Sequence, residues 1–189
     1  MRWTIPNILT LLRIALIPVF MVSYYLPFSW AHLLTTAIFG LAAITDWFDG
    51  YLARRLGQVS PFGAFLDPVA DKLIVAVALI MLVQGNPTLW FVLPAAVIVG
   101  REIAISALRE WMAELGERAR VKVSAVGKIK TTAQMTALLM LLYREDLWEV
   151  IPTHTIGVAL LYVAAVLTLW SMVVYLRAAW PTLSAPENS

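Results

Sequence analysis

Four aspartates stand close together in the segment Thr45–Lys72, and most of the side chains around them are apolar. They form two pairs whose members are three and four residues apart, so each pair lies on one face of a helix. Carboxylates gathered in this way bind divalent cations or accept protons during catalysis. The four residues are Asp46, Asp49, Asp67 and Asp71.

The composition indicates that these carboxylates belong to a membrane protein. The chain has 189 residues, of which 61% are hydrophobic and 14% are charged, whereas soluble domains are nearer half apolar and a quarter charged. The excess of apolar residues is too large for one buried core, so we predict an all-α integral membrane protein.

The net charge of +2 is compatible with anionic lipid headgroups and gives no reason to expect nucleic acid. With no cysteine, disulfides and thiolate metal sites are excluded.

Six segments are long and apolar enough for the roughly 20 residues that a helix needs to cross a bilayer. We expect residues 1–181 to form one six-helix transmembrane domain, and residues 182–189 to form a flexible C-terminal tail. Although Arg2 precedes an apolar run, as in a signal peptide, Arg13 interrupts that run and no small-residue cleavage site follows, so we expect the first helix to be retained. The predicted spans are Asn7–Leu26, Trp30–Arg54, Phe65–Val83, Leu89–Ala113, Ser124–Tyr143 and Ile156–Leu176.

Basic residues orient these spans. The loops that follow the second and fourth spans are rich in arginine and lysine, whereas the loops at the other side carry almost none. Because basic loops remain in the cytoplasm, both termini are predicted to be cytoplasmic.

In this frame the two aspartate pairs meet at one depth. Asp46 and Asp49 lie about 12 and 7 Å inside the boundary marked by Arg54, at 1.5 Å per helical residue. Gly57, Ser60 and Pro61 break the helix and turn the chain back, and Ser60 and Pro61 are predicted as the cap and first position of a short helix that leads into the third span. The second pair therefore enters the membrane from the same cytoplasmic side.

Placing an ionised carboxylate at this depth costs on the order of several kcal/mol unless its charge is compensated. Protonation would neutralise them, and so would divalent cations, for which carboxylates favour Mg²⁺, Mn²⁺ or Ca²⁺. A structural alternative is pairing with Arg54, Arg55 and Lys72. Since His32 and His154 are predicted at the far side, a histidine zinc site is not expected.

Small residues beside the aspartates would allow a bulky ligand or a second helix to approach the backbone closely. They are Gly50, Ala53, Gly63 and Ala64.

The aspartate segment resembles the signature of the CDP-alcohol phosphatidyltransferase family, which is D-x-x-D-G-x-x-A-R, eight residues, then G-x-x-x-D-x-x-x-D. The stretches "IPNILTLLRIALIPVF" and "GREIAISALRE" resemble the branch that makes phosphatidylglycerophosphate. The signature reads here as Asp46, Asp49, Gly50, Ala53, Arg54, Gly63, Asp67 and Asp71, without departure.

The resemblance implies a bacterial inner-membrane enzyme of six helices that forms homodimers and whose active site faces the cytoplasm. It implies two divalent cations, Mg²⁺ or Mn²⁺, held by Asp46, Asp49, Asp67 and Asp71, with Asp71 also serving as general base. The implied donor is CDP-diacylglycerol and the acceptor is sn-glycerol 3-phosphate, giving phosphatidylglycerophosphate and CMP. The donor-site residues would be Asn7, Thr10, Gly50, Ala53, Arg54 and Gly63.

The phosphate of the acceptor would need cations. We expect it to contact Arg101, Arg109 and Lys128, of which Arg101 lies deepest in its span. Glu102 and Glu110 could instead pair with the two arginines as structural partners. The more distal basic residues, Arg118, Arg120 and Lys122, are better explained as topology signals.

At the N-terminus, Asn7, Thr10 and Arg13 form a polar stripe at helical spacing. The stripe either lines the donor site, as the resemblance suggests, or includes a helix cap at Asn7.

Other functions remain compatible with parts of this pattern. The same chemistry could use another acceptor, such as serine or inositol phosphate. A small cation channel or transporter could use the aspartates as an ion site, although its acids would be spread through the span. A non-enzymatic assembly protein would not need glycines at these spacings. Binding of a cytidine nucleotide separates the enzyme from the channel.

Overall fold

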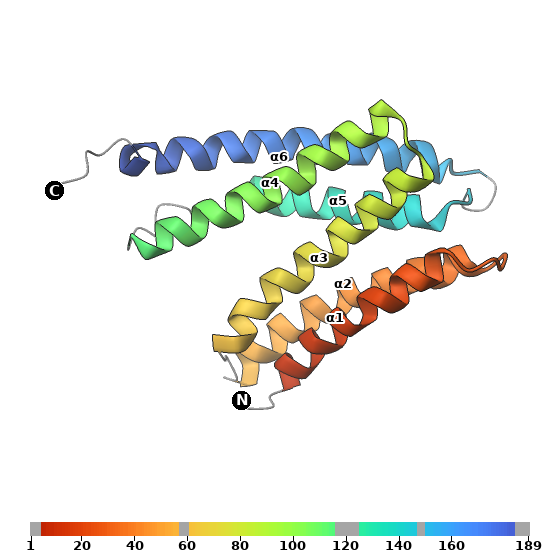
Figure 1. The fold of residues 1–189 in the computed structure, drawn as a ribbon, viewed down its shortest axis with the longest axis horizontal. Coiled ribbons are helices and arrows are strands. Elements are labelled where there is room, and N and C mark those ends of the chain that lie inside the picture. The colour runs from red at the N-terminus through yellow and green to blue at the C-terminus, as the bar shows by residue number, and fades with distance from the viewer. Residues whose placement is uncertain (1–4, 57–60, 116–124, 147–149, 184–189) are drawn as a thin grey trace. The chain divides into compact units, whose positions relative to one another are not determined.

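The structure is a computed structural model, and it describes residues 5–56, 61–115, 125–146 and 150–183. Within these ranges the chain forms six α-helices, which confirms the all-α prediction (Figure 1). They are α1 (Ile5–Tyr24), α2 (Ala31–Leu56), α3 (Pro61–Gly85), α4 (Leu89–Glu114), α5 (Ala125–Tyr143) and α6 (Thr153–Leu183).

Two helices, α3 and α6, extend well beyond the apolar spans predicted from the sequence. α3 begins at Pro61, which confirms the predicted first position of a short helix leading into the span at Phe65, since proline suits a position where no backbone N–H is needed. α6 continues through Leu183, past the predicted Leu176 and into the segment assigned to the tail. A hydropathy pattern locates the apolar part of a helix and does not report polar turns beyond it.

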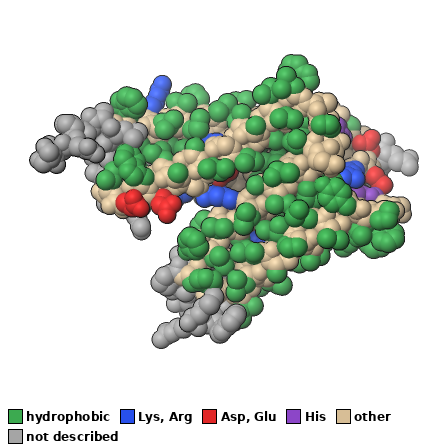
Figure 2. All heavy atoms as spheres, viewed as in Figure 1, with side chains coloured by type: hydrophobic (Ala, Val, Ile, Leu, Met, Phe, Trp, Pro, Cys, Tyr) green, Lys and Arg blue, Asp and Glu red, His purple; other side chains and the backbone are tan. Residues whose placement is uncertain are grey.

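Three helices are long and apolar enough to cross a membrane, judged over the described residues. Their qualifying segments are Asn7–Tyr24, Leu89–Glu114 and Thr153–Trp180, with mean hydropathies of 1.7, 1.8 and 2.2. Hydrophobic side chains are spread over the face shown in Figure 2. Among the exposed hydrophobic residues, Trp90 and Trp170 are 73% and 64% exposed. Such surfaces suit a lipid environment, so the chain has the character of a membrane protein.

The chain divides into two compact units. Unit 1 comprises Met1–Asn86 and Leu138–His154, and unit 2 comprises Pro87–Ala137 and Thr155–Ser189. In unit 1, α1 packs against both α2 and α3. Phe20 of α1 and Phe39 of α2 are fully buried, with ring centroids 5.9 Å apart. This packing aligns one face of α1 with the two helices that contain the aspartates.

At one end of unit 1, aromatic and charged side chains connect the helices to one another. The hydroxyl of Tyr24, at the end of α1, donates to the carbonyl of Met81 in α3 at 3.0 Å. Arg144, just after α5, has a positive φ of 64° and places its guanidinium 4.2 Å from the Tyr24 ring centre. His32 at the start of α2 lies 3.4 Å from the Glu145 carboxylate. These contacts fix α1 at the end opposite to the aspartates.

Unit 2 contains α4 and α6 together with most of α5. α4 and α6 share a core formed by Ile105, Met112, Tyr175 and Ala179. The hydroxyl of Tyr162 in α6 also donates to the carbonyl of Trp90 in α4 at 2.6 Å. The core holds the middle of α4 beside α6, where the buried polar residues of this unit lie.

Candidate active site

In unit 1 the polar stripe of α1 contacts three of the four aspartates. Arg13 Nη1 donates to Asp46 Oδ1 at 2.9 Å and to Asp71 Oδ1 at 2.5 Å. Thr10 Oγ1 donates to Asp67 Oδ1 at 2.5 Å. Because Asp46 is on α2 and the other two are on α3, α1 links both halves of the signature.

The side chains of this cluster differ in their exposure to solvent. Thr10 and Arg13 are 0% and 1% exposed, whereas the side chains of Asp46 and Asp71 are 42% and 45% exposed. The carboxylates are therefore anchored on buried α1 and remain open on their other side. A ligand can approach them there without displacing the core.

Carboxylates supply most of the charged groups in the contacts described for this cluster. One guanidinium faces the carboxylates of Asp46 and Asp71, while the hydroxyl of Thr10 brings no charge to Asp67. Hard oxygen ligands with net negative charge suit Mg²⁺ or Mn²⁺, so the donor set fits the implied metals.

The structure leaves part of the predicted metal and donor site outside the described side chains. That part comprises Asp49, Gly50, Ala53 and Arg54. Among the side chains that are described, no three of Asp, Glu and His gather closely enough to hold a metal ion. Gly63 is buried in α3. The ligand set therefore stays a prediction.

Two interpretations of the sequence change. Arg13, which the sequence places in the polar stripe with Asn7 and Thr10, is the cation that contacts Asp46 and Asp71. Asn7 is the third residue of α1 and is 3% exposed, so the suggestion that it caps the helix is wrong. A cap would have to precede the first helical residue.

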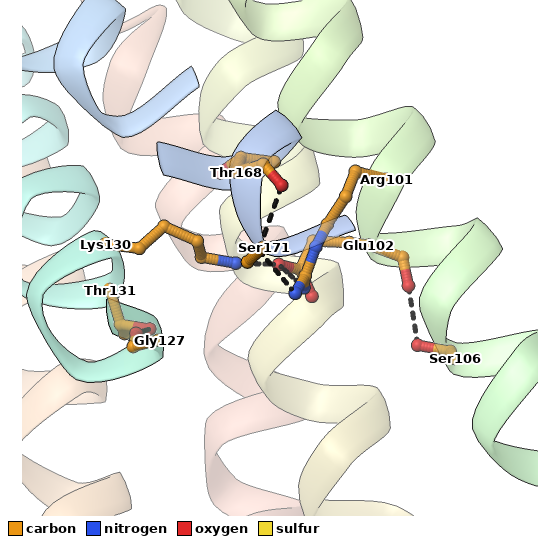
Figure 3. Close-up of polar contacts among 8 residues, drawn as sticks. All are labelled: Arg101, Glu102, Ser106, Gly127, Lys130, Thr131, Thr168 and Ser171. Atoms are coloured by element: carbon orange, nitrogen blue, oxygen red, sulfur yellow. Dashed lines mark hydrogen bonds and ion pairs between the residues drawn. The ribbon is translucent and has the colours of Figure 1, made fainter. Parts of the chain in front are cut away.

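A second polar cluster lies in unit 2, where α4, α5 and α6 each contribute side chains (Figure 3). Arg101 Nη1 contacts Glu102 Oε1 at 3.1 Å, and its Nη2 donates to Ser171 Oγ at 3.0 Å. The same guanidinium lies 5.5 Å from the ring centre of Tyr175. Lys130 Nζ donates to Glu102 Oε1 at 2.5 Å. Glu102 thus joins the two cations.

This cluster is buried and has a net positive charge. Arg101 and Lys130 are 8% and 5% exposed, and one carboxylate faces both of them. Arg101 Nε, Gln134 Oε1 and Thr168 Oγ1 are buried and have no hydrogen-bond partner among the described residues. Buried polar atoms are normally satisfied. The Nε–H of Arg101 and the hydroxyl of Thr168 can donate to an anion, whereas Gln134 Oε1 can only accept, so two of the three atoms suit an anionic ligand.

The predicted acceptor residues do not share one environment. Arg101 is buried and pairs with Glu102, as the structural alternative anticipated. Arg109 is exposed and forms no ion pair within the described residues, so it does not join the buried face of Arg101. The side chain of Lys128 lies outside the described part of the chain.

Sequence reasoning missed Lys130 and Ser171. Charged residues inside a membrane usually pair, so the sequence indicates that Glu102 pairs with a lysine of the fifth span, but it does not distinguish Lys130 from Lys128.

The sequence of the chain is similar to those of known phosphatidyltransferases. A model of the CDP-alcohol phosphatidyltransferase family matches residues 3–170. The CDP-diacylglycerol–glycerol-3-phosphate 3-phosphatidyltransferase of Pectobacterium atrosepticum is 58% identical over 98% of this chain and 100% of its own length. Proteins of the same name are 58% identical in Salmonella typhimurium and 55% identical in Shigella flexneri, over 95% of this chain and 96% of each relative.

Proposed function

The chain belongs to the CDP-alcohol phosphatidyltransferase family, and on that premise we propose that it transfers the phosphatidyl group of CDP-diacylglycerol to sn-glycerol 3-phosphate. The products are phosphatidylglycerophosphate and CMP. The names of the relatives support the acceptor. The observation that carries the assignment is the attachment of Asp46, Asp67 and Asp71 to the buried face of α1, because it gathers the family's acidic signature into one anionic site.

Asp46, Asp49, Asp67 and Asp71 would hold two divalent cations, Mg²⁺ or Mn²⁺. When bound, such cations neutralise phosphate charge and stabilise the departing CMP. Thr10 and Arg13 orient Asp67, Asp46 and Asp71 from the buried side. Asn7, Gly50, Ala53, Arg54 and Gly63 complete the proposed donor site.

The transfer needs one proton acceptor and no covalent enzyme intermediate. A hydroxyl oxygen of glycerol 3-phosphate attacks the phosphorus that bears the diacylglycerol group, and the bond from that phosphorus to the CMP oxygen breaks. CMP leaves with the bonding electron pair. Asp71 accepts the hydroxyl proton as general base.

We assign the phosphate of the acceptor to the cluster around Arg101. Arg101 and Lys130 supply two buried cations, and the planar guanidinium can donate two parallel hydrogen bonds to phosphate oxygens. Arg109 and Lys128 remain proposed contacts from the sequence.

The same proposal covers the setting of the enzyme. The six helices would all span the inner membrane of a bacterium, with both termini and the aspartates at the cytoplasmic side, and the protein would act as a homodimer. The distribution of basic residues supports this orientation, and the bacterial relatives support the compartment.

The function is tested by offering the purified protein CDP-diacylglycerol with separate acceptors: glycerol 3-phosphate, serine, inositol phosphate and unphosphorylated glycerol. Mass spectrometry of the lipid product identifies the acceptor used. We expect phosphatidylglycerophosphate and CMP in equal amounts with glycerol 3-phosphate only. A dominant product with serine or inositol phosphate would replace the acceptor assignment while keeping the reaction class.

Replacing Arg101 with glutamine should act through the acceptor. Loss of a charge-assisted contact to phosphate costs about 1.5–3 kcal/mol, or roughly 10–150-fold in kcat/KM for glycerol 3-phosphate. The KM for CDP-diacylglycerol should change little. Lysine at this position should restore only part of the loss, since it lacks the two-pronged guanidinium. Steady-state kinetics with both substrates varied give these values.

Ser171→Ala is the matched control, because it removes a partner of Arg101 without changing charge. It should affect acceptor kinetics much less than Arg101→Gln does. If Arg101→Gln lowers only the melting temperature and leaves acceptor kinetics unchanged, Arg101 stabilises unit 2 through Glu102 and Tyr175 and does not bind phosphate.

A further inference from the structure

We propose that Arg13 is a resident cation of the aspartate site, which neutralises the carboxylates when no metal is bound and weakens their affinity for divalent metal. The inference rests on the proposed function for one step only, the assignment of the aspartates as metal ligands. It concerns a residue outside the acidic signature, and it gives that residue a role in controlling when the metal binds.

The geometry places the guanidinium where a metal cation would compete with it. A single nitrogen, Arg13 Nη1, reaches an oxygen of Asp46 and an oxygen of Asp71. These two carboxylates come from different helices and from the two halves of the signature. Arg13 therefore already bridges α2 and α3 through the kind of oxygen atoms that a hard divalent cation uses.

Burial makes this competition hard to avoid. Arg13 is 1% exposed and lies in the middle of α1, so its charge cannot move away into solvent. Like charges a few ångströms apart repel strongly where water is excluded. A divalent cation must either displace the guanidinium from the shared oxygens or bind beside it, and both events lower the affinity.

The repulsion has a functional consequence. The diphosphate of the donor brings negative charge, and this charge offsets the repulsion between Arg13 and the metal. Metal and donor should then each raise the other's affinity, since such coupling is reciprocal. In the absence of metal, Arg13 prevents the carboxylates from repelling α2 and α3 apart.

Thr10 separates the effect of charge from the effect of positioning. It holds Asp67 from the same face of α1, at 2.5 Å, but it is neutral. Removing its hydroxyl with Thr10→Val loosens a carboxylate without removing a cation. If positioning alone matters, Thr10→Val and Arg13→Gln should change metal affinity in the same direction. If Arg13 competes with metal, they should differ in sign.

The experiment measures Mn²⁺ binding to the full-length protein in detergent without donor, from the loss of the electron paramagnetic resonance signal of free Mn²⁺. Arg13→Gln should bind Mn²⁺ about tenfold more tightly or better, because a fixed like charge has been removed. Arg13→Lys, which keeps the charge, should stay within about threefold of the wild type. Thr10→Val should bind no more tightly than the wild type.

Melting temperatures give a second readout. In chelator, Arg13→Gln should unfold at a lower temperature than the wild type, and Mn²⁺ should recover more of the stability of this variant, because a metal can take over the role of the guanidinium. Preparing the variant in Mn²⁺ protects it during purification. A variant that does not fold even with Mn²⁺ would show that Arg13 is a fixed structural element, which overturns the proposal.

The remaining outcomes separate this proposal from the proposed function. If the wild type binds Mn²⁺ and Arg13→Gln binds it equally or more weakly, only the competing role of Arg13 is wrong. If neither protein binds Mn²⁺, the aspartates are not a metal site, and both the metal assignment and the role of Arg13 fall together.

Discussion

Replacing Asp71 with asparagine should lower turnover by at least the roughly 10²–10⁴-fold that is typical of a lost general base. Asparagine keeps the size of the side chain and an oxygen that can still accept the hydrogen bond from Arg13 Nη1. It cannot take up the proton that the attacking hydroxyl must release. The rate constant should therefore fall while the arrangement of α1 and α3 is kept, and single-turnover kinetics measure the chemical step directly.

Asp46→Asn provides the comparison for that result. Asp46 contacts the same guanidinium nitrogen at 2.9 Å, but it is assigned as a metal ligand only. Its replacement should weaken donor and metal binding more than Asp71→Asn does. Near-normal turnover in Asp71→Asn would exclude Asp71 as the base, and equal losses in both variants would indicate that Asp71 acts through the metal alone.

The aspartates illustrate what sequence spacing can predict. Intervals of three and four residues place each pair on one helix face, and the predicted short turn makes their two helices neighbours. In the structure Asp46 and Asp71, from α2 and α3, reach the same nitrogen of Arg13. Local periodicity and a short connection were therefore sufficient to predict their approach.

Sequence spacing could not identify Arg13 as the cation between Asp46 and Asp71. Spacing relates residues on one helix, whereas the position of Arg13 depends on how α1 packs against α2 and α3, and this packing involves residues such as Phe20 and Phe39. Lys130 is a similar case in unit 2. It reaches Glu102 from another helix, and no pattern within α5 distinguishes it from Lys128.

The ends of the helices were predicted less well than their centres. The six predicted segments each overlap one of the six described helices, of which three are long and apolar enough to cross a membrane. The predicted apolar span of α3 begins at Phe65, whereas the described helix begins at Pro61, the position that the sequence predicts as the start of a short helix leading into that span. The lesson matters for the site, since Gly63 lies in the first turn of α3 and belongs to the signature.

Removing divalent metal should abolish turnover, and adding back Mg²⁺ or Mn²⁺ should restore it. Carboxylates of Asp46, Asp67 and Asp71 gather at the face of α1, so a diphosphate that binds there needs cations to offset the repulsion between like charges. Without metal, the negative donor would meet negative carboxylates, and the departing CMP would have no counter-charge. The measurement is CMP release by protein dialysed against chelator, followed by titration with each metal.

The loss should be chemical and not structural, because Arg13 still joins α2 and α3 through Asp46 and Asp71 when metal is absent. The wild type in chelator should therefore keep a cooperative melting transition and recover full activity within the mixing time of added Mn²⁺. In Arg13→Gln the same treatment should lower the melting temperature and make recovery slow or incomplete. Full turnover by wild-type protein after exhaustive dialysis would exclude a two-metal mechanism, and Asp71 would then have to work in an active site that neutralises the diphosphate with arginine and lysine alone.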